Sequence, residues 1–396
     1  MKNRWDLFNT VDEFYGKKSK IEDTIVIASQ HLLWTQLEMF KRLLSHNLDS
    51  NKLYIIGKNY STNREVFETL QQTGAYIDPS SIQFNPNKSF DSQFDNNIEQ
   101  LLDKVEQEHH IDKHTCILLD DWWHLIEIAQ KKWRNEKYKL LGIEQTSSGY
   151  HKIKDLDLDY LNVARSNTKL IYETPFIGDL WIERIMESIK KHDIQDPNCL
   201  IVWCWPIGES ILMRLRNLWI SYTWFDNKHT YQKILSQTSK IDISEKHFLD
   251  FYQKNIKKFN MIVWSTGSNI LSFEKIKHLW PKVALISMSS SDREFPAVEI
   301  RTHADTTTSE IHSDRNYKNI TLINSWFPIT FQGNYHESPP EIIELTIALL
   351  YAGVLHQNFK NNEKHSTPWF NILNARLVEW FKRRLALHKI PYKIKQ

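Results

Sequence analysis

Short apolar runs alternate with segments of helical periodicity along most of this chain, and that alternation limits the folds open to it. Asp23–Ser29 (DTIVIAS) and Leu53–Gly57 (LYIIG) are typical of buried strands, and each is followed by a segment of helical periodicity, at Leu32–Leu48 and Asn63–Gly74. Strands that alternate with helices favour parallel sheets, because a parallel connection needs a crossover element. We therefore predict an α/β protein.

The same pattern gives the domain organisation. With 396 residues the chain is long enough for two domains of ordinary size. A new strand–helix–strand unit begins at Leu200 and runs to Asp226. We predict two Rossmann-like, doubly wound parallel-sheet domains with a cleft between them. Periodicity also predicts helices at Asn96–Glu108, Ile177–Lys191, Pro340–His356 and Asn371–His388, and strands at Cys116–Leu119, Leu200–Trp203, Met261–Trp264, Val283–Ser287 and Ile320–Asn324.

Charge and cysteine usage exclude several classes of function. Lys and Arg number 50 against 48 Asp and Glu, without a dense basic stripe, which argues against nucleic-acid binding. The three cysteines (Cys116, Cys199 and Cys204) lie in or beside apolar runs without a C-x-x-C pair, which favours reduced core thiols. No apolar run reaches membrane-spanning length, and the N-terminus lacks a signal peptide's apolar core. We expect a soluble cytoplasmic protein that binds neither membrane nor metal.

Four stretches carry polar groups that packing alone does not require. His31 follows the first strand, and Asp120-Asp121 ends the strand near residue 119, where ligands of open α/β sheets bind. The alternatives are a histidine that is simply hydrogen-bonded and an aspartate that caps the next helix. Gly142–Gly149 (GIEQTSSG) is a polar loop able to bind phosphate or ribose. Lys169 and Glu173 share one helical face at i,i+4, either as a catalytic pair or as a surface ion pair.

Taken in order, these stretches resemble the S-adenosylhomocysteine hydrolase (adenosylhomocysteinase) family. The likeness covers roughly residues 25–350 and depends on the ordered set rather than on any single motif. The family's sequence features are matched here by His31, Ser61-Thr62-Asn63, Asp120-Asp121-Trp122-Trp123, Glu144-Gln145-Thr146-Ser147-Ser148-Gly149, Asn162-Val163, Thr168-Lys169 with Glu173, and Trp203-Cys204-Trp205-Pro206-Ile207-Gly208.

The resemblance implies reversible cleavage of S-adenosylhomocysteine, or a related nucleoside thioether, to adenosine and homocysteine through NAD-dependent oxidation of the ribose 3′-hydroxyl. Lys169 and Glu173 would act on that hydroxyl, and His31 and Asp121 on the C4′ and C5′ side. It also implies a homo-oligomer, a dimer or tetramer. The substrate-binding residues implied are Thr35, Ser61, Thr62, Asn63, Gln145 and Asn162, and the cofactor-binding residues are Thr146, Ser147, Ser148, Trp203, Trp205, Pro206, Ile207, Gly208 and Asp226.

The resemblance also implies domain boundaries and has clear departures. Residues 1–175 with 345–396 would form the substrate domain and residues 176–344 the NAD-binding domain. Gln145 replaces a ribose-binding glutamate of the family, and Trp203 and Trp205 replace fingerprint glycines that admit the pyrophosphate. Two other functions therefore stay open. One is a catalytically silent relative that binds or regulates, and the other is a different Rossmann-type NAD oxidoreductase.

Tryptophan also stands at other positions of glycine type. Trp122 and Trp123 fall on a Gly-Gly of the family pattern, Trp219 falls where a glycine would end a helix, and Trp264 and Trp326 lie in turn-like contexts. The chain has 15 Trp and only 10 Gly, whereas glycine ordinarily makes up about 7% of residues. We hypothesise that several of these tryptophans are encoded by UGA codons, which the source organism would translate as glycine.

Overall fold

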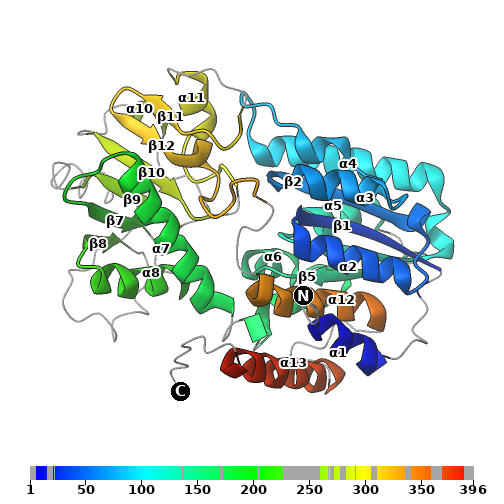
Figure 1. Cartoon of the computed structure of the whole chain (residues 1–396). Coiled ribbons are helices and arrows are strands. Elements are labelled where there is room, and N and C mark those ends of the chain that lie inside the picture. Colours follow the sequence, from blue (N-terminus) through cyan, green and yellow to red (C-terminus); the bar gives the residue numbers. More distant parts are fainter. Residues whose placement is uncertain are drawn as a thin grey trace. The chain divides into compact units, whose positions relative to one another are not determined.

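The computed structural model describes residues 6–15, 21, 23–134, 138–166, 168–169, 173–202, 206–225, 259–265, 267, 272–276, 282–289, 291–304, 310–334, 340–357 and 368–387 (Figure 1). The chain divides into two compact units. Unit 1 comprises residues 1–83, 94–173 and 333–396, and unit 2 comprises residues 84–93 and 174–332. The divisions lie at 173/174 and 332/333, where we predicted 175/176 and 344/345, and the placement of residues 84–93 with unit 2 was not predicted.

Unit 1 is built on a six-stranded parallel sheet with the order β3-β2-β1-β4-β5-β6. This is the strand order of doubly wound dinucleotide-binding folds. In β1 every residue but His31 is buried, as expected of a strand whose sheet is covered on both faces. The strands are β1 (Thr24–Leu32), β2 (Leu53–Thr62), β3 (Tyr76–Ile77), β4 (Thr115–Asp120), β5 (Lys139–Glu144) and β6 (Asp159–Asn162).

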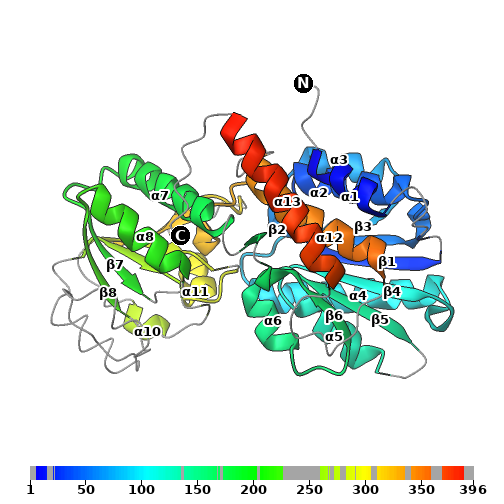
Figure 2. The same cartoon turned by 90° about the horizontal axis from the view of Figure 1, so that it is seen from below.

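Helices from both ends of the chain cover the unit 1 sheet. The apolar helix α12 (Pro340–His356) packs against β4 and β5 and also against α1 (Asp6–Tyr15) and α2 (Trp34–Ser45), while α13 (Pro368–Leu387) packs against α1 and α12 (Figure 2). C-terminal residues therefore complete the core that the first strands begin. The remaining helices of unit 1 are α3 (Arg64–Gln71), α4 (Phe90–Glu108), whose first turn belongs to unit 2, α5 (His124–Lys132) and α6 (Ser147–Ile153).

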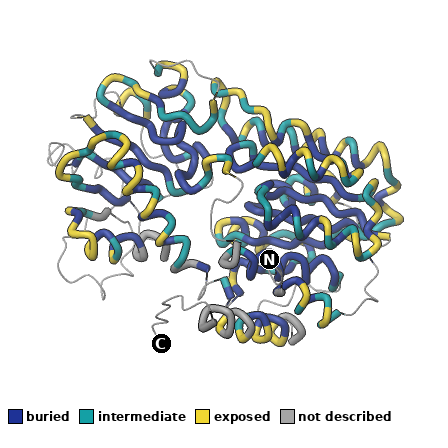
Figure 3. Tube along the Cα trace, viewed as in Figure 1, coloured by how far each residue is buried: buried dark blue, intermediate teal, exposed yellow. Residues whose placement is uncertain are grey.

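Unit 2 contains a second six-stranded sheet, with the order β11-β12-β10-β9-β7-β8, in which only β11 is antiparallel. Its central strands are buried on both faces, as are those of unit 1 (Figure 3). The predicted α/β class with two doubly wound sheets is therefore correct. The elements are α7 (Thr174–Lys191), β7 (Asn198–Val202), α8 (Pro206–Asn217), β8 (Ser221–Phe225), β9 (Met261–Trp264), α10 (Phe273–Ile276), β10 (Val283–Ser287), α11 (Ala297–Thr302), β11 (Arg315–Tyr317) and β12 (Ile320–Leu322).

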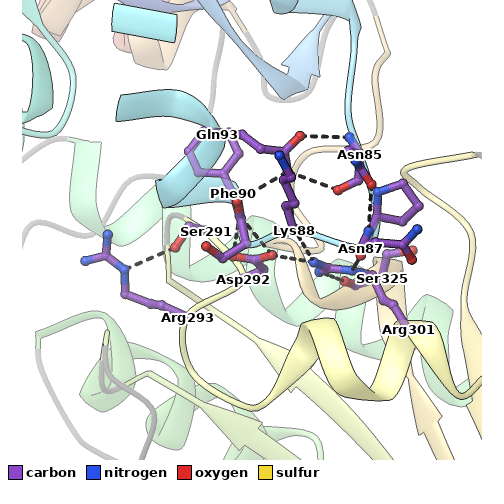
Figure 4. A network of polar contacts seen from close by, with 12 residues as sticks. Asn85, Asn87, Lys88, Phe90, Gln93, Ser291, Asp292, Arg293, Arg301 and Ser325 are labelled. Carbon is purple, nitrogen blue, oxygen red and sulfur yellow. Dashed lines mark hydrogen bonds and ion pairs between the residues drawn. The ribbon is translucent and has the colours of Figure 1, made fainter. Parts of the chain in front are cut away.

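A buried ion pair ties residues 84–93 into unit 2 (Figure 4). The backbone N–H of Phe90, at the start of α4, donates to both carboxylate oxygens of Asp292 at 3.0 and 3.2 Å. Arg301 donates to Asp292 at 2.6 Å and to the carbonyl oxygens of Pro86 and Lys88 at 3.1 and 3.2 Å. Both charged side chains are 1% exposed, so the pair and its backbone partners satisfy one another away from water.

Three local predictions were wrong. Gly142–Gly149 is not a loop, because Gly142 lies within β5 and Gly149 within α6. The strand predicted to end at Gly57 continues to Thr62 as β2, so the polar residues that follow Gly57 also belong to the sheet. Trp264 ends strand β9 and is fully buried, so it does not lie in a turn.

Candidate functional site

The functional side chains of unit 1 gather where the strand order reverses direction. After β1 the chain builds β2 and β3 on one side and then crosses to β4 on the other, and ligands of such sheets bind outside the carboxyl ends of these strands. His31 lies near the carboxyl end of β1 and Asp121 directly after β4. The Asp121 N–H donates to the carbonyl of Ser29 at 3.0 Å, which holds the two strand ends level.

Four residues from three strand ends form one connected group, which we call the His31 cluster: His31, Lys58, Ser61 and Asp121. One carboxylate oxygen of Asp121 contacts both His31 Nε2, at 2.6 Å, and Lys58 Nζ, at 2.8 Å. The other ring nitrogen of His31, Nδ1, is hydrogen-bonded to Ser61 Oγ. The Lys58 side chain is 0% exposed and that of Asp121 is 3% exposed, so both charges are out of water.

The charges of the cluster fix its protonation. Burial lowers the pKa of His31, and the positive charges of Lys58 and Lys169 lower it further, against the opposing effect of Asp121. Burial alone would raise the pKa of Asp121, but Lys58 and His31 together outweigh it and hold that pKa well below its ordinary value. At neutral pH the cluster therefore combines a neutral imidazole with an ionised carboxylate. This is the arrangement of a general base oriented by an acid partner.

Lys169 and Glu173 also belong to unit 1 and form the predicted ion pair. Lys169 Nζ lies 3.3 Å from a Glu173 carboxylate oxygen, and the two side chains are 19% and 4% exposed. The hydroxyl of Thr346, in α12, donates to the same carboxylate. A pair this buried is not an ordinary surface salt bridge, and the positive charge of Lys169 contributes to lowering the pKa of His31.

Several buried polar atoms, in residues close in sequence to these groups or at neighbouring strand ends, have no hydrogen-bond partner among the described residues. They are the Ser29 hydroxyl, both amide atoms of Gln30, the Gln145 side-chain oxygen and the Thr168 hydroxyl. Ser29 and Gln30 directly precede His31, Gln145 follows β5, and Thr168 precedes Lys169. Since buried polar groups are nearly always hydrogen-bonded, atoms of this kind are what a bound polar ligand would satisfy.

Two further buried acids organise the turn after β4. Glu144 accepts hydrogen bonds from the N–H groups of Trp122, Trp123 and Thr146, at 3.3, 2.9 and 2.6 Å. Asp120 accepts one from the Ile126 N–H at 2.9 Å and so binds the first turn of α5. Burial raises the pKa of Asp120 to about 6; burial and the charge of Asp120 raise that of Glu144 to about 8. Asp120 thus takes the capping role and leaves Asp121 to the cluster.

The residues predicted to bind substrate fall into two groups. Ser61 belongs to the His31 cluster, and Gln145 carries one of the unpartnered oxygens. The other four make local bonds: Thr35 donates to Gln36, Thr62 donates to the Lys58 carbonyl, Asn63 caps α3 by accepting from Val66 N–H, and Asn162 accepts from Arg165 N–H.

The residues predicted to bind cofactor divide between the two units. Thr146 caps α6 through the Gly149 N–H at 3.0 Å, and Ser147 and Ser148 are the first residues of that helix, so these three belong to unit 1. Pro206, Ile207 and Gly208 open α8 in unit 2, beyond strand β7, which lies between β9 and the edge strand β8. Trp203, Trp205 and Asp226 lie outside the described residues.

Sequence reasoning missed Lys58. The stretch KNYST after Gly57 reads as polar and exposed, whereas the structure places it inside β2. The available signal was the resemblance of Ser61-Thr62-Asn63 to a substrate-binding segment, three residues beyond Lys58. In the part of the chain that the structure describes, no group of three or more His, Cys, Asp or Glu side chains could hold a metal ion.

Comparisons with known proteins give relatives without an assigned activity. No protein-family model matches the chain. Two curated proteins of Mycobacterium tuberculosis, from strains CDC 1551 and H37Rv and both described as uncharacterized, are 31% identical over 348 residues. The match covers 86% of this chain and 65% of each relative, so the chain spans less than the full length of these proteins.

Solved structures with a related chain path have low similarity. The A chain of dipicolinate synthase from Bacillus subtilis is 12% identical with a TM-score of 0.38, over 92% of this chain and 98% of that one. An NADPH-dependent glyoxylate/hydroxypyruvate reductase from Sinorhizobium meliloti is 9% identical with a TM-score of 0.39, over 68% of this chain and 90% of that one. Likeness at this level carries no inference about activity. Among the described residues, no helix is both long and apolar enough to cross a membrane.

Proposed function

We propose that the protein cleaves a nucleoside thioether, S-adenosylhomocysteine or a close analogue, through oxidation and re-reduction of the ribose 3′-hydroxyl. The observation that carries the proposal is that unit 1 holds both the His31 cluster and the buried Lys169–Glu173 pair. The Lys169–Glu173 pair can act on a hydroxyl, and His31 with Asp121 can act on a neighbouring carbon. Oxidation followed by elimination requires both actions. The unpartnered atoms of Gln30 and Gln145 would bind the ligand's hydroxyls and ring nitrogens.

The roles of the residues follow from their charges. The Lys169 ammonium holds the 3′-hydroxyl, and Glu173, held by Thr346, takes up its proton as the carbinol is oxidised. The neutral His31 then removes the proton at C4′, which the adjacent ketone makes acidic, and Asp121 stabilises the imidazolium. The imidazolium returns that proton to the sulfur that departs from C5′. Addition of water at C5′ and reduction of the ketone complete the hydrolysis.

A nicotinamide dinucleotide would supply the hydride acceptor and donor for this chemistry. The strand–helix passage from β7 to α8 fits such a group, because β7 lies between β8 and β9 and α8 opens with its N-terminus toward the strand's carboxyl end. Trp203 and Trp205 stand where this type of passage needs glycine. We propose Pro206, Ile207 and Gly208 as residues that hold the pyrophosphate.

Turnover of S-adenosylhomocysteine by the Lys169→Ala variant is the test. Free homocysteine thiol and adenosine are measured in parallel, and nucleotide released by denaturation is identified by mass spectrometry. We expect kcat to fall by about 100-fold or more while the released nucleotide is unchanged. Lys131→Ala is the matched control, because Lys131 also pairs with a glutamate at i,i+4 but is 66% exposed. Equal turnover in both variants would contradict the proposal.

A catalytically silent binding protein is the second candidate, and one observation favours it. Trp122 is 3% exposed, and its ring lies 5.6 Å from Lys58 Nζ, so an indole occupies space beside the His31 cluster. A protein of this kind would show no thiol release from S-adenosylhomocysteine and would release no nicotinamide dinucleotide on denaturation. The same assay therefore separates the two candidates.

A further inference from the structure

Four tryptophans adopt a backbone conformation that side chains disfavour. Among the described residues, eleven other than glycine have positive φ, and four of them are tryptophans: Trp122 (φ 103°), Trp123 (51°), Trp219 (59°) and Trp326 (75°). The other seven are Asn, Asp, Lys, Ser or Gln, and none is Leu, Ile, Val, Phe or Tyr. Positive φ is uncommon outside glycine, is enriched in Asn and Asp, and marks a genuine outlier for a bulky residue.

Trp219 shows most clearly what the backbone requires. The Trp219 N–H donates to the Arg216 carbonyl at 3.2 Å, and the Ile220 N–H donates to the Leu215 carbonyl at 3.1 Å. This is the Schellman motif, in which the residue at the position of Trp219 must be left-handed and is usually glycine. The same bond pattern ends α2 with Asn47 and α7 with Asp193, which tolerate that conformation. The Trp219 side chain is 95% exposed, so its packing does not compensate for the strain.

Trp122 and Trp123 form a turn in which their backbone N–H groups, and not their indoles, contact Glu144. The φ of Trp122, 103°, lies beyond the left-handed helical region, near +50° to +70°. Trp326 ends a run of three positive-φ residues that begins at Asn324. By contrast Trp133 and Trp264, which are equally buried, have ordinary backbone angles.

We propose that residues 122, 123, 219 and 326 are glycine in the protein that the source organism makes, encoded by UGA codons that the organism reads as glycine. A translation that reads UGA as tryptophan turns each of these into an indole, which also accounts for 15 Trp beside 10 Gly. Glycine would make the same hydrogen bonds, since each of those at residues 122, 123 and 219 is donated by a backbone N–H, to the Glu144 carboxylate or to a backbone carbonyl.

The functional consequence deepens the proposed function and rests on it. With glycine at 122 and 123, the space of two adjoining indoles, of which that of Trp122 lies beside Lys58, becomes a pocket after β4. The Lys58–Asp121–His31 contacts then line one wall, and the pocket is suited to a polyhydroxylated sugar ring. We assign this space to the ribose of the substrate.

Codons and peptide masses test the inference directly. The gene is sequenced at the four positions, and the protein purified from its source is digested and analysed by mass spectrometry. We expect UGA codons and peptides lighter by the difference between an indolylmethyl group and a hydrogen, with UGG at Trp133 as the internal control. A UGG codon at 122 or 219, or a tryptophan-containing peptide across either, overturns the inference.

Ligand binding tests the pocket separately. The Trp122→Gly/Trp123→Gly variant and the chain as written are titrated with adenosine by calorimetry, with Trp219→Gly as the control. We expect at least about tenfold tighter binding for the double variant alone, a difference of about 1.4 kcal/mol. Equal binding by all three overturns the pocket. If the codons are UGA and adenosine still fails to bind, the proposed function fails while the glycine assignment stands.

Discussion

Replacing Lys58 by methionine removes the fully buried cation that shares one oxygen of Asp121 with His31. Methionine keeps the length and apolar character of the stem, so the variant changes charge more than volume. Because Lys58 Nζ and His31 Nε2 lie 2.8 and 2.6 Å from the same oxygen atom, they are separated by at most the sum of these distances. The Lys58 charge therefore acts on His31 at close range.

The magnitude follows from that separation. Two unit charges about 5 Å apart, at an effective dielectric constant of about 20, repel by about 3 kcal/mol. Loss of Lys58 should therefore raise the pKa of His31, because the charge of Lys58 is one of the causes that lower it. Removing one partner of a buried ion pair also costs about 3–5 kcal/mol of stability. Part of this cost should be recovered as the pH falls, because His31 becomes protonated and replaces the missing positive charge beside Asp121.

Two measurements check this reasoning. The pKa of His31 is read from its ring proton resonance as a function of pH, and the free energy of unfolding is measured in urea at pH 8 and pH 6. Lys131→Met, at an exposed ion pair, is the control and should change neither quantity. A His31 pKa that is the same in the Lys58→Met variant and the parent would refute the electrostatic account of the cluster.

Three further perturbations have defined outcomes. Trp219→Gly removes the backbone strain of a left-handed residue whose side chain is exposed, and it should raise the free energy of unfolding by about 0.5–1 kcal/mol. Leu218→Gly, at the preceding residue, should lower the free energy of unfolding, and urea titration measures both changes. Gly149→Ala places a β carbon 2.3 Å from the Glu144 carboxyl carbon and should cost about 1–3 kcal/mol by thermal unfolding; a neutral result would mean that the turn after β4 is not tightly packed. Because the pKa of His31 is lowered in the folded state, this residue binds more protons in the unfolded chain below about pH 6.5, so its own contribution to stability should fall with decreasing pH, opposite in sign to the contributions of Asp120 and Glu144. The free energy of unfolding of His31→Asn relative to the parent, measured in urea between about pH 7 and about pH 5, should therefore rise as the pH falls.

The sequence predicted the fold better than the details of the site. Long apolar runs such as Thr24–Leu32 identified the central strands, because strands buried on both faces need continuous hydrophobicity. Their carboxyl ends placed His31 and Asp121 at one edge. Lys58 escaped prediction because lysine is almost never fully buried, and only its pairing with Asp121 across the sheet makes it so. Such a pairing is a property of the tertiary structure.

Tryptophans 122, 219 and 326 were singled out as glycine-like from sequence alone, and the structure gives each a positive φ. Trp264 was also singled out as glycine-like, and that prediction was wrong, because Trp264 ends a buried strand. A turn-like neighbourhood of Ser, Thr and Gly does not fix the residue that precedes it. The hydrogen-bond pattern of the backbone does, and that pattern becomes visible only in three dimensions.

The buried bonds between Asp292, Arg301 and residues 86–90 have a practical consequence for anyone who wishes to produce half of this molecule. A fragment that stops at residue 173 would contain the Pro86 and Lys88 carbonyls but not Arg301, which donates to them. It would also lack α12, which packs against β4 and β5 of the same unit. A fragment of residues 174–332 would contain Asp292 and Arg301 without the backbone groups of residues 86–90 to which they are hydrogen-bonded. Neither piece is a natural expression unit, so dissection of this protein calls for permuted or grafted chains in place of simple truncation.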